Sequence, residues 1–398
     1  MRMGEECRLK IQVGVFFGGR SVEHEVSVIS GLQAFAALDR QKYDAVPVYI
    51  TKEGLFYTGP AFGDIAAYKD IPALLRTGGQ VIPVSEGGRV SLVRHPAKKL
   101  GNNVLAVIDA ALPVVHGTNA EDGVLQGLFE MLDLPYAGPD VLSAALCMDK
   151  AASKTLLDTA GLPVLPALVV NTFDWVECPD AETKRLEDTF PYPVVIKPIN
   201  LGSSIGISVA STRESLCRSL DLAFKFATRV LVEPAVVNLR EINCAVLGDD
   251  EEAKASVCEE PLGSGEILSY QDKYLSSGKQ SGMQSAQRRI PADLSAEQEK
   301  TIRSLAVKVF QTLHCNGVAR VDFLLDTASG AIYVNEINAI PGSLSFYLWE
   351  PAGLSFPALL DQMLTLALKR HRKRKTLLFS CETNILSGVS LGGKKGKL

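Results

Sequence analysis

A chain of 398 residues is too long for a single hydrophobic core and indicates two or three domains. Hydrophobic residues make up 46% of it and charged residues 22%, which is ordinary for a water-soluble protein of mixed helices and strands. The net charge of −4 excludes a general attraction to nucleic acid or membrane surfaces, and no apolar run reaches the roughly 18 residues of a membrane helix. The first ten residues lack the apolar stretch of a secretory signal, so we expect a cytoplasmic protein.

Residues 11–17 predict a buried strand that runs into two glycines, and an apolar helical pattern follows from about residue 26 to 38. A strand, a glycine turn and a helix open a doubly wound α/β unit, whose ligand crevice lies at the carboxyl ends of its strands. Glu23 lies at this crevice, although a helix dipole alone also favours an acid in a first helical turn. We therefore expect residues 1–147 to form a domain with a parallel sheet.

The polar turn 116–123 follows further predicted strands at 43–50 and within 104–115. Its first residue, His116, is expected at the same sheet edge as Glu23. A histidine at a strand end can be structural or can contact a ligand, and the sequence leaves both possibilities open.

A loop rich in glycine and serine, residues 199–206, joins two predicted strands in a second domain over residues 148–236. It lacks the Walker pattern, which joins a strand to a helix. Backbone N–H groups of such a loop can still wrap phosphates, and Lys197 supplies a positive charge at its base.

A connector follows the strand that ends at Glu233 and leads into a third domain over residues 237–370. Connectors between small domains form clefts for an adenine ring, and Glu241 could accept hydrogen bonds from ribose hydroxyls, although both glutamates could also be simply exposed. The polar stretch 262–288 has the length of a lid, with Lys273 and Tyr274 as its most reactive members.

Acids among apolar residues distinguish the predicted β-hairpin at 317–342. Its fold sets Asp322 opposite Asn335 or Glu336, and the two-residue strand period puts Glu336 and Asn338 on one face. Three oxygen donors then converge, which favours Mg²⁺ or Mn²⁺ over zinc. The alternative is a structural ion pair between Asp322 and Arg320, which lies two residues earlier.

A basic run starts near Lys369, and residues 371–398 are expected to form a disordered tail. Such a run can bind acidic surfaces or can be a solvated chain end.

Several separated segments together resemble the D-alanine–D-alanine ligases of the ATP-grasp superfamily: GGRSVEHEVS, HGTNAEDG, MDK, VVIKPINLGSSIG, LVEP, SYQDKY, ARVDF and NEINAIPG. The resemblance runs from about residue 11 to 370 and implies a three-domain ATP-grasp fold that combines α/β and α+β organisation. It also implies that ATP phosphorylates one D-alanine and that the amine of a second attacks the acyl phosphate, which yields D-alanyl-D-alanine for peptidoglycan synthesis. A homodimer and two Mg²⁺ ions, with Mn²⁺ as a substitute, are implied as well.

The resemblance also assigns roles to individual residues. For the first D-alanine and the acyl transfer it implies Glu23, Ser203, Tyr274, Arg320 and Gly342, with His116 and Tyr347 among the substrate-binding positions. For ATP it implies Lys150, Lys197, Ser203, Ser204, Glu233, Val236, Glu241 and Lys273, and for the metal ions Asp322, Glu336 and Asn338.

Two positions depart from the family pattern. Tyr347 stands where a serine that holds the carboxylate of the acceptor would align, and Pro234 follows Glu233 where a lysine or an acid is common. The relatives that make D-alanyl-D-lactate typically carry histidine in place of Tyr274, so a tyrosine favours an amine acceptor. The alternatives are a ligase for D-alanyl-D-serine or D-alanyl-D-lactate, and a non-catalytic nucleotide-binding regulator.

Overall fold

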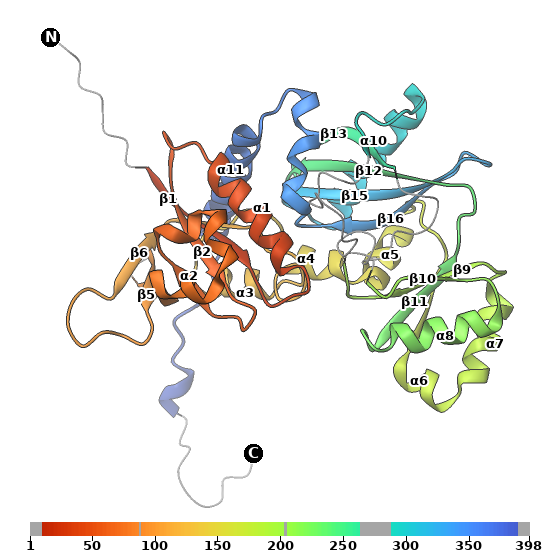
Figure 1. Cartoon of the computed structure of the whole chain (residues 1–398), viewed down its shortest axis with the longest axis horizontal. Helices are drawn as coiled ribbons and strands as arrows, with labels where there is room; N and C mark the ends of the chain where they lie inside the picture. The colour runs from red at the N-terminus through yellow and green to blue at the C-terminus, as the bar shows by residue number, and fades with distance from the viewer. Residues whose placement is uncertain (1–9, 87–88, 203–204, 263–287, 389–398) are drawn as a thin grey trace, which may run out of the picture.

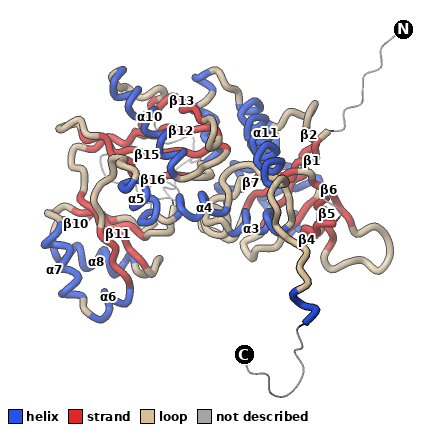
Figure 2. The backbone as a smooth tube through the Cα atoms, turned by 180° about the vertical axis from the view of Figure 1, so that it is seen from behind, coloured by secondary structure: helices blue, strands red, loops and turns tan. Residues whose placement is uncertain are grey.

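The computed structural model describes residues 10–86, 89–202, 205–262 and 288–388, which build three β-sheets with their helices (Figure 1). The N-terminal sheet lies at one end of the molecule and the other two sheets lie at the opposite end, as the view from behind also shows (Figure 2). Within the described ranges, no helix combines the length and the hydropathy that a membrane crossing requires.

The N-terminal part contains these elements: β1 (Ile11–Gly18), α1 (His24–Ala37), β2 (Tyr43–Ile50), β3 (Phe56–Thr58), η1 (Pro60–Gly63), η2 (Ile65–Lys69), α2 (Ile71–Thr77), β4 (Gly79–Glu86), β5 (Arg89–Arg94), β6 (Val104–Ile108), β7 (Ala110–Pro113) and α3 (Val124–Met131). Its sheet has the order β6-β5-β4-β3-β2-β1-β7. β1 runs parallel to β2 and β7, which is the predicted parallel centre, and β3 to β6 continue it as an antiparallel arm.

The sequence predicted one strand within residues 104–115, but this segment forms two. They are the two edge strands of the sheet: β6 pairs with β5 and β7 pairs with β1. Asp109 separates them, and its carboxylate accepts a hydrogen bond of 2.9 Å from the backbone N–H of Gln12. β7 therefore ends beside β1, and this brings the turn that begins at His116 next to the glycine turn after β1.

Two short helices, α4 (Val141–Met148) and α5 (Lys150–Thr159), lead from this sheet to the others (Figure 1). Asp149 separates the two helices, because its extended backbone ends α4 while its side chain accepts hydrogen bonds from the N–H groups of Ala151 and Ala152 and so caps α5. The cap places Lys150 in the first turn of α5.

The central sheet is antiparallel, in the order β10-β9-β11-β8. Its part of the chain contains β8 (Leu168–Asn171), α6 (Thr172–Glu177), α7 (Pro179–Thr189), β9 (Val194–Pro198), β10 (Ser208–Ala210), α8 (Arg213–Ala223) and β11 (Arg229–Pro234). The glycine- and serine-rich loop joins β9 to its antiparallel neighbour β10, as the sequence predicts.

The C-terminal sheet has the order β14-β13-β12-β15-β16. Its part of the chain contains β12 (Leu239–Gly248), β13 (Ala253–Pro261), β14 (Arg288–Arg289), α10 (Ala296–Thr312), β15 (Gly317–Asp326), β16 (Ile332–Asn338), η3 (Gly342–Leu348), η4 (Glu350–Ala352), α11 (Phe356–Arg374) and η5 (Ile385–Gly388). β15 and β16 form the predicted hairpin.

Side-chain alternation gives this sheet one apolar face and one polar face. Along β15, the odd-numbered Ala319, Val321 and Phe323 pack into a core with α10. The burial of each large apolar side chain there stabilises the fold by about 1.5–3 kcal/mol. The even-numbered Arg320 and Asp322 therefore face the opposite side, which is the side of the candidate site.

Helix α11 joins the N-terminal and C-terminal sheets. Its apolar residues share one core with Phe17 of β1 and Leu247 of β12. The basic run at its end is also bound: Arg370 donates hydrogen bonds of 2.8 Å to the carbonyl oxygens of Tyr136 and Gly138. The expectation of a disordered tail from residue 371 is wrong for residues 371–374, because α11 continues to Arg374, whereas Arg372 and Lys373 are solvent-exposed as expected. Residues 389–398 lie outside the described ranges.

Candidate active site

A row of polar residues crosses the polar face of the C-terminal sheet. Glu259 of β13 pairs in register with Asn243 of β12, Asn243 with Asp322 of β15, and Asp322 with Glu336 of β16. The predicted pairing of Asp322 with residue 335 or 336 is therefore resolved to Glu336, and a register shift beside Asp322 leaves Asn335 unpaired in the ladder. Neighbouring strands are about 4.8 Å apart, so these side chains are close enough to interact.

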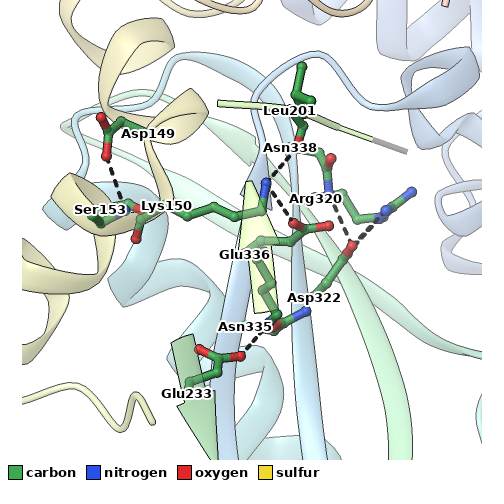
Figure 3. A network of polar contacts seen from close by, with 12 residues as sticks. Asp149, Lys150, Ser153, Leu201, Glu233, Arg320, Asp322, Asn335, Glu336 and Asn338 are labelled. Atoms are coloured by element: carbon green, nitrogen blue, oxygen red, sulfur yellow. Dashed lines mark hydrogen bonds and ion pairs between the residues drawn. The ribbon is translucent and has the colours of Figure 1, made fainter. Parts of the chain in front are cut away.

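Asp322 is bound by the guanidinium group of Arg320. Nε and Nη2 of Arg320 each lie 2.6 Å from one carboxylate oxygen, and Asn338 Nδ2 donates a hydrogen bond of 3.0 Å to Oδ2 (Figure 3). Burial raises the pKa of Asp322 to about 6, against the lowering effect of Arg320, and the charge of Glu336 adds to the increase. The structure thus contains the ion pair that the sequence offered as the alternative to metal binding.

The donor set nevertheless fits a hard divalent cation. Asp322 and Glu336 face each other and Asn338 lies beside them, so carboxylate and amide oxygens come together on one half-buried face. A single guanidinium group satisfies only Asp322. In the part of the chain that the structure describes, no cluster of three or more His, Cys, Asp or Glu side chains is arranged to hold a metal ion, so the metal site stays a prediction.

Lys150 connects this row to the glycine-rich loop. Its Nζ donates a hydrogen bond of 2.6 Å to the carbonyl oxygen of Leu201 and lies 3.4 Å from Oε2 of Glu336 (Figure 3). These groups, with Asn338 and Gly202, line a cavity of about 30 Å³. A positive charge, a glycine-rich backbone and the predicted metal ligands therefore meet at one point, as phosphate binding requires.

Glu233 and two lysines form a buried cluster on the central sheet. Nζ of Lys154 lies 2.6 Å from one carboxylate oxygen of Glu233, and Nζ of Lys197 contacts the other oxygen. Nζ of Lys197 also donates a hydrogen bond of 2.8 Å to Oδ1 of Asn335. Burial lowers the pKa of Lys154, whereas the two ammonium groups keep the pKa of Glu233 below its usual value despite its burial. Glu233 is therefore not surface-exposed, and Lys154 is a member of the cluster that sequence reasoning did not single out.

Glu23 lies where the N-terminal sheet meets the glycine-rich loop. A Cβ atom on Gly117 would lie 3.0 Å from Oε2 of Glu23, and one on Gly202 would lie 3.1 Å from the same atom. Gly117 also has a φ of 80°, which favours glycine there, and a side chain at Gly202 would require the carboxylate to shift by a few tenths of an ångström. Glu23 and the glycine-rich loop therefore meet at Gly202.

His116 is fully packed between three segments. Its ring nitrogens lie 2.9 Å from the carbonyl oxygen of Ile340 and 3.0 Å from the hydroxyl of Ser30, and its backbone N–H donates to Ser27. Burial lowers its pKa, so the neutral ring is favoured. Through these contacts His116 connects helix α1 to the chain that follows β16.

Glu121 is a neighbour of this site that the sequence did not single out. Its Oε2 accepts a hydrogen bond of 2.6 Å from the N–H of Gly117, and its side chain lines the same cavity as Lys150. Burial and, second, the charge of Glu23 raise its pKa to about 8. The sequence feature that could have indicated Glu121 as a site residue is its position in the polar turn that begins at His116.

The chain after β16 turns sharply at Gly342. Ser343, Leu344 and Ser345 all have positive φ angles, between 49° and 53°, a conformation that costs a non-glycine residue about 1–2 kcal/mol. The strained turn places Tyr347 against Glu259, and the tyrosine hydroxyl donates a hydrogen bond of 3.2 Å to Oε1. Glu259 is a second acid that sequence reasoning missed.

The remaining predicted residues lie outside the buried contacts described above or outside the described residues. Glu241 lies on β12 with its side chain exposed, and Val236 lies in the connector between β11 and β12, partly buried. Ser203, Ser204, Lys273 and Tyr274 lie outside the described residues.

Two family models match this chain, the D-ala D-ala ligase N-terminus over residues 12–139 and the D-ala D-ala ligase C-terminus over residues 156–365. A D-alanine–D-alanine ligase of Caldicellulosiruptor bescii is 39% identical over 380 residues, which cover 94% of this chain and 99% of that protein. A ligase of the same name from Geobacillus kaustophilus is 36% identical over 377 residues, with 94% and 98% covered.

Solved structures agree with these matches. The D-alanine-D-alanine ligase of Coxiella burnetii has a TM-score of 0.76 at 31% identity and covers 92% of this chain and 96% of its own. The VanG D-Ala:D-Ser ligase of Enterococcus faecalis has a TM-score of 0.75 at 32% identity, with 90% and 100% covered. The predicted ATP-grasp architecture is confirmed by these neighbours. Both halves of the chain match, and so the protein belongs to the D-alanine–D-alanine ligase family.

Proposed function

We propose that the protein joins two molecules of D-alanine to D-alanyl-D-alanine, with conversion of ATP to ADP and phosphate. One observation carries this proposal: Oε2 of Glu23 lies against the backbones of Gly117 and Gly202, so a substrate-binding acid and a phosphate-binding loop share one site. A carboxylate is a poor electrophile until it is phosphorylated, and this arrangement holds a D-amino acid where its carboxylate can meet the γ-phosphate of ATP.

The donor D-alanine is proposed to bind through its ammonium group to Glu23. The phosphates are proposed to lie along the glycine-rich loop, with Ser203, Ser204, Lys150 and Lys197 around them. The position of Lys150 supports this, since its Nζ already holds the loop through Leu201. Phosphoryl transfer depends on positioned cations more than on covalent chemistry, and these lysines would supply the positive charge around the phosphates.

The adenosine is proposed to bind at the connector between the central and C-terminal sheets, near Glu233, Val236 and Glu241. Lys273 and Tyr274 are proposed to close over the site, because an acyl phosphate hydrolyses when water reaches it.

Asp322, Glu336 and Asn338 would hold two Mg²⁺ ions, for which Mn²⁺ could substitute. Bound there, the ions would neutralise charge on the transferred phosphoryl group. The opposition of Asp322 and Glu336 in register supports this ligand set. Burial and, to a lesser extent, the charge of Glu336 raise the pKa of Asp322, and a bound cation would offset both effects.

Arg320 and the N–H group of Gly342 are proposed to stabilise the oxyanion that forms when the second amine attacks. In the described structure the guanidinium of Arg320 binds both oxygens of Asp322. The same group would therefore turn from Asp322 towards the developing charge once the predicted cations compensate Asp322.

Phosphate release tests the proposed function. Protein, ATP and Mg²⁺ should release phosphate only when D-alanine is added, and L-alanine should not replace it. Phosphate release that is independent of a D-amino acid would contradict the proposal.

The identity of the second substrate is the alternative within this proposal. The similarity to a D-Ala:D-Ser ligase, at a TM-score of 0.75, favours D-serine as the next candidate acceptor. We also propose a cytoplasmic homodimer, which is supported only by the family resemblance and is tested by light scattering on the purified protein.

A further inference from the structure

Beside Arg320, the polar face of the C-terminal sheet carries a second charged pair that the proposed chemistry does not use. It consists of Glu259 on β13 and Arg288 on β14, with Tyr347 between them. The guanidinium carbon of Arg288 lies 4.6 Å from the centre of the Tyr347 ring, and Nη1 of Arg288 lies 3.6 Å from Oε2 of Glu259.

The two oxygens of Glu259 have different surroundings. Oε1 accepts hydrogen bonds from Asn243 Nδ2 at 3.0 Å and from the Tyr347 hydroxyl at 3.2 Å. Oε2 is buried and accepts no hydrogen bond from the described residues, although Glu259 as a whole is only 3% exposed. A buried carboxylate is costly without a cation, and Arg288 is a cation beside this oxygen, so Glu259 needs a replacement cation whenever Arg288 binds another anion.

The position of the pair fits the second substrate. Glu259 lies in the same register row as Asn243 and Asp322, so it is about two strand spacings, or roughly 10 Å, from Asp322. Tyr347 follows Gly342 on the strained turn, so the pair borders both groups that the proposed mechanism assigns to the oxyanion. An acceptor must approach the acyl carbon from a site of this kind.

We propose that Glu259 and Arg288 bind the two charged ends of the acceptor, Glu259 its ammonium group and Arg288 its carboxylate, and thereby select an amino acid over a hydroxy acid. This inference rests on the proposed ligase function. At neutral pH a D-amino acid is a zwitterion, and a carboxylate beside a guanidinium group is its electrostatic complement. D-Lactate has the same carboxylate and no ammonium group, so it would engage Arg288 and leave the buried carboxylate of Glu259 without a compensating cation.

The two charges make different predictions, which separates recognition from a structural role. Glu259→Gln keeps the shape and removes the charge that only an amine acceptor uses. It should raise the KM for the acceptor D-alanine by about 10- to 100-fold, which corresponds to one charge-assisted hydrogen bond. Arg288→Gln removes the charge that both acceptors use, so it should weaken both of them equally.

The experiment offers D-alanine and D-lactate together with ATP and Mg²⁺ and measures D-alanyl-D-alanine and D-alanyl-D-lactate by mass. Glu259→Gln should raise the D-lactate share about 10- to 100-fold, whereas Arg288→Gln should lower both products and leave their ratio within about twofold. The matched control is Glu260→Gln, the next residue on β13. Glu260 is bound by Arg240 and Arg289, so its variant should keep the wild-type product ratio.

The outcomes are distinguishable. If the wild type makes no dipeptide, the proposed function fails. If the wild type is active and Glu259→Gln lowers the total product at an unchanged ratio, Glu259 is structural and the inference is overturned. If circular dichroism shows that Glu259→Gln is unfolded, Arg288→Gln decides: an unchanged KM for the acceptor overturns the inference.

Discussion

Asp322 lies directly opposite Glu336 in the β15–β16 ladder, and Arg320 compensates only one of these two acids. Glu336 forms an ion pair with Lys150, whose Nζ lies 3.4 Å from its Oε2, and we propose that it also binds a cation. Glu336→Gln should therefore reduce D-alanine-dependent phosphate release at least about a hundredfold, because an amide is a much poorer ligand for Mg²⁺. Circular dichroism should show an intact fold. The exposed Glu297→Gln on α10 is the control, and unchanged turnover of Glu336→Gln would remove this residue from the metal site.

Glu233 forms buried ion pairs with two lysines, and we expect these ion pairs to stabilise the fold. Glu233→Gln leaves the buried ammonium groups of Lys154 and Lys197 without their counter-charge. Removal of one partner of a buried ion pair costs about 3–5 kcal/mol, so the free energy of unfolding in urea should fall by that amount. Lys52→Met breaks the exposed pair with Glu25 and should cost less than about 1 kcal/mol. Equal effects of the two variants would contradict the buried cluster.

The hairpin and its acids could be predicted from the sequence because strand alternation is a local property. Asp322, Glu336 and Asn338 follow a two-residue period among apolar neighbours, and a polar turn fixes their register to within a residue. The resemblance supplied roles for Glu23 and Lys150, and the structure brings both to the glycine-rich loop.

Contacts between distant segments could not be predicted in this way. Glu259 is one acid in a strand, and its importance comes only from register with Asn243 and from Tyr347, which lies 88 residues further along the chain. The basic run after Lys369 gave a local signal for a solvated end. Its docking on Tyr136 depends on how α11 crosses between two sheets, which no local pattern encodes.

Glu121 should make stability depend on pH. Its pKa is raised to about 8 in the folded protein from an ordinary value of 4.5, by burial and by Glu23. Between roughly pH 5 and 8 the folded state keeps a proton that the unfolded state has lost, so stability falls as pH rises, by at most about 1.4 kcal/mol per pH unit. Glu121→Gln should lack this decline. Urea unfolding of both proteins across the range measures it, and parallel curves would contradict the assignment.

Arg370 should hold α11 against the N-terminal sheet. Its guanidinium group donates to two carbonyl oxygens at 2.8 Å and stacks 4.3 Å from the centre of the Tyr136 ring. Arg370→Met removes both charge-assisted hydrogen bonds and should lower the free energy of unfolding by about 2–4 kcal/mol. The nearby Arg372 is exposed, so Arg372→Met should change stability by less than about 0.5 kcal/mol. A loss of similar size in both variants would mean that the general charge of the helix end matters, and not this contact.

The central claim is the ligation of two D-alanines, and identification of the product by mass tests it most directly. D-Alanine, D-serine and D-lactate are offered together at equal concentrations with ATP and Mg²⁺. We expect D-alanyl-D-alanine as the main product, formed with one ADP per dipeptide. ADP formation without any D-alanyl product, or a main product that contains D-serine or D-lactate, would contradict it.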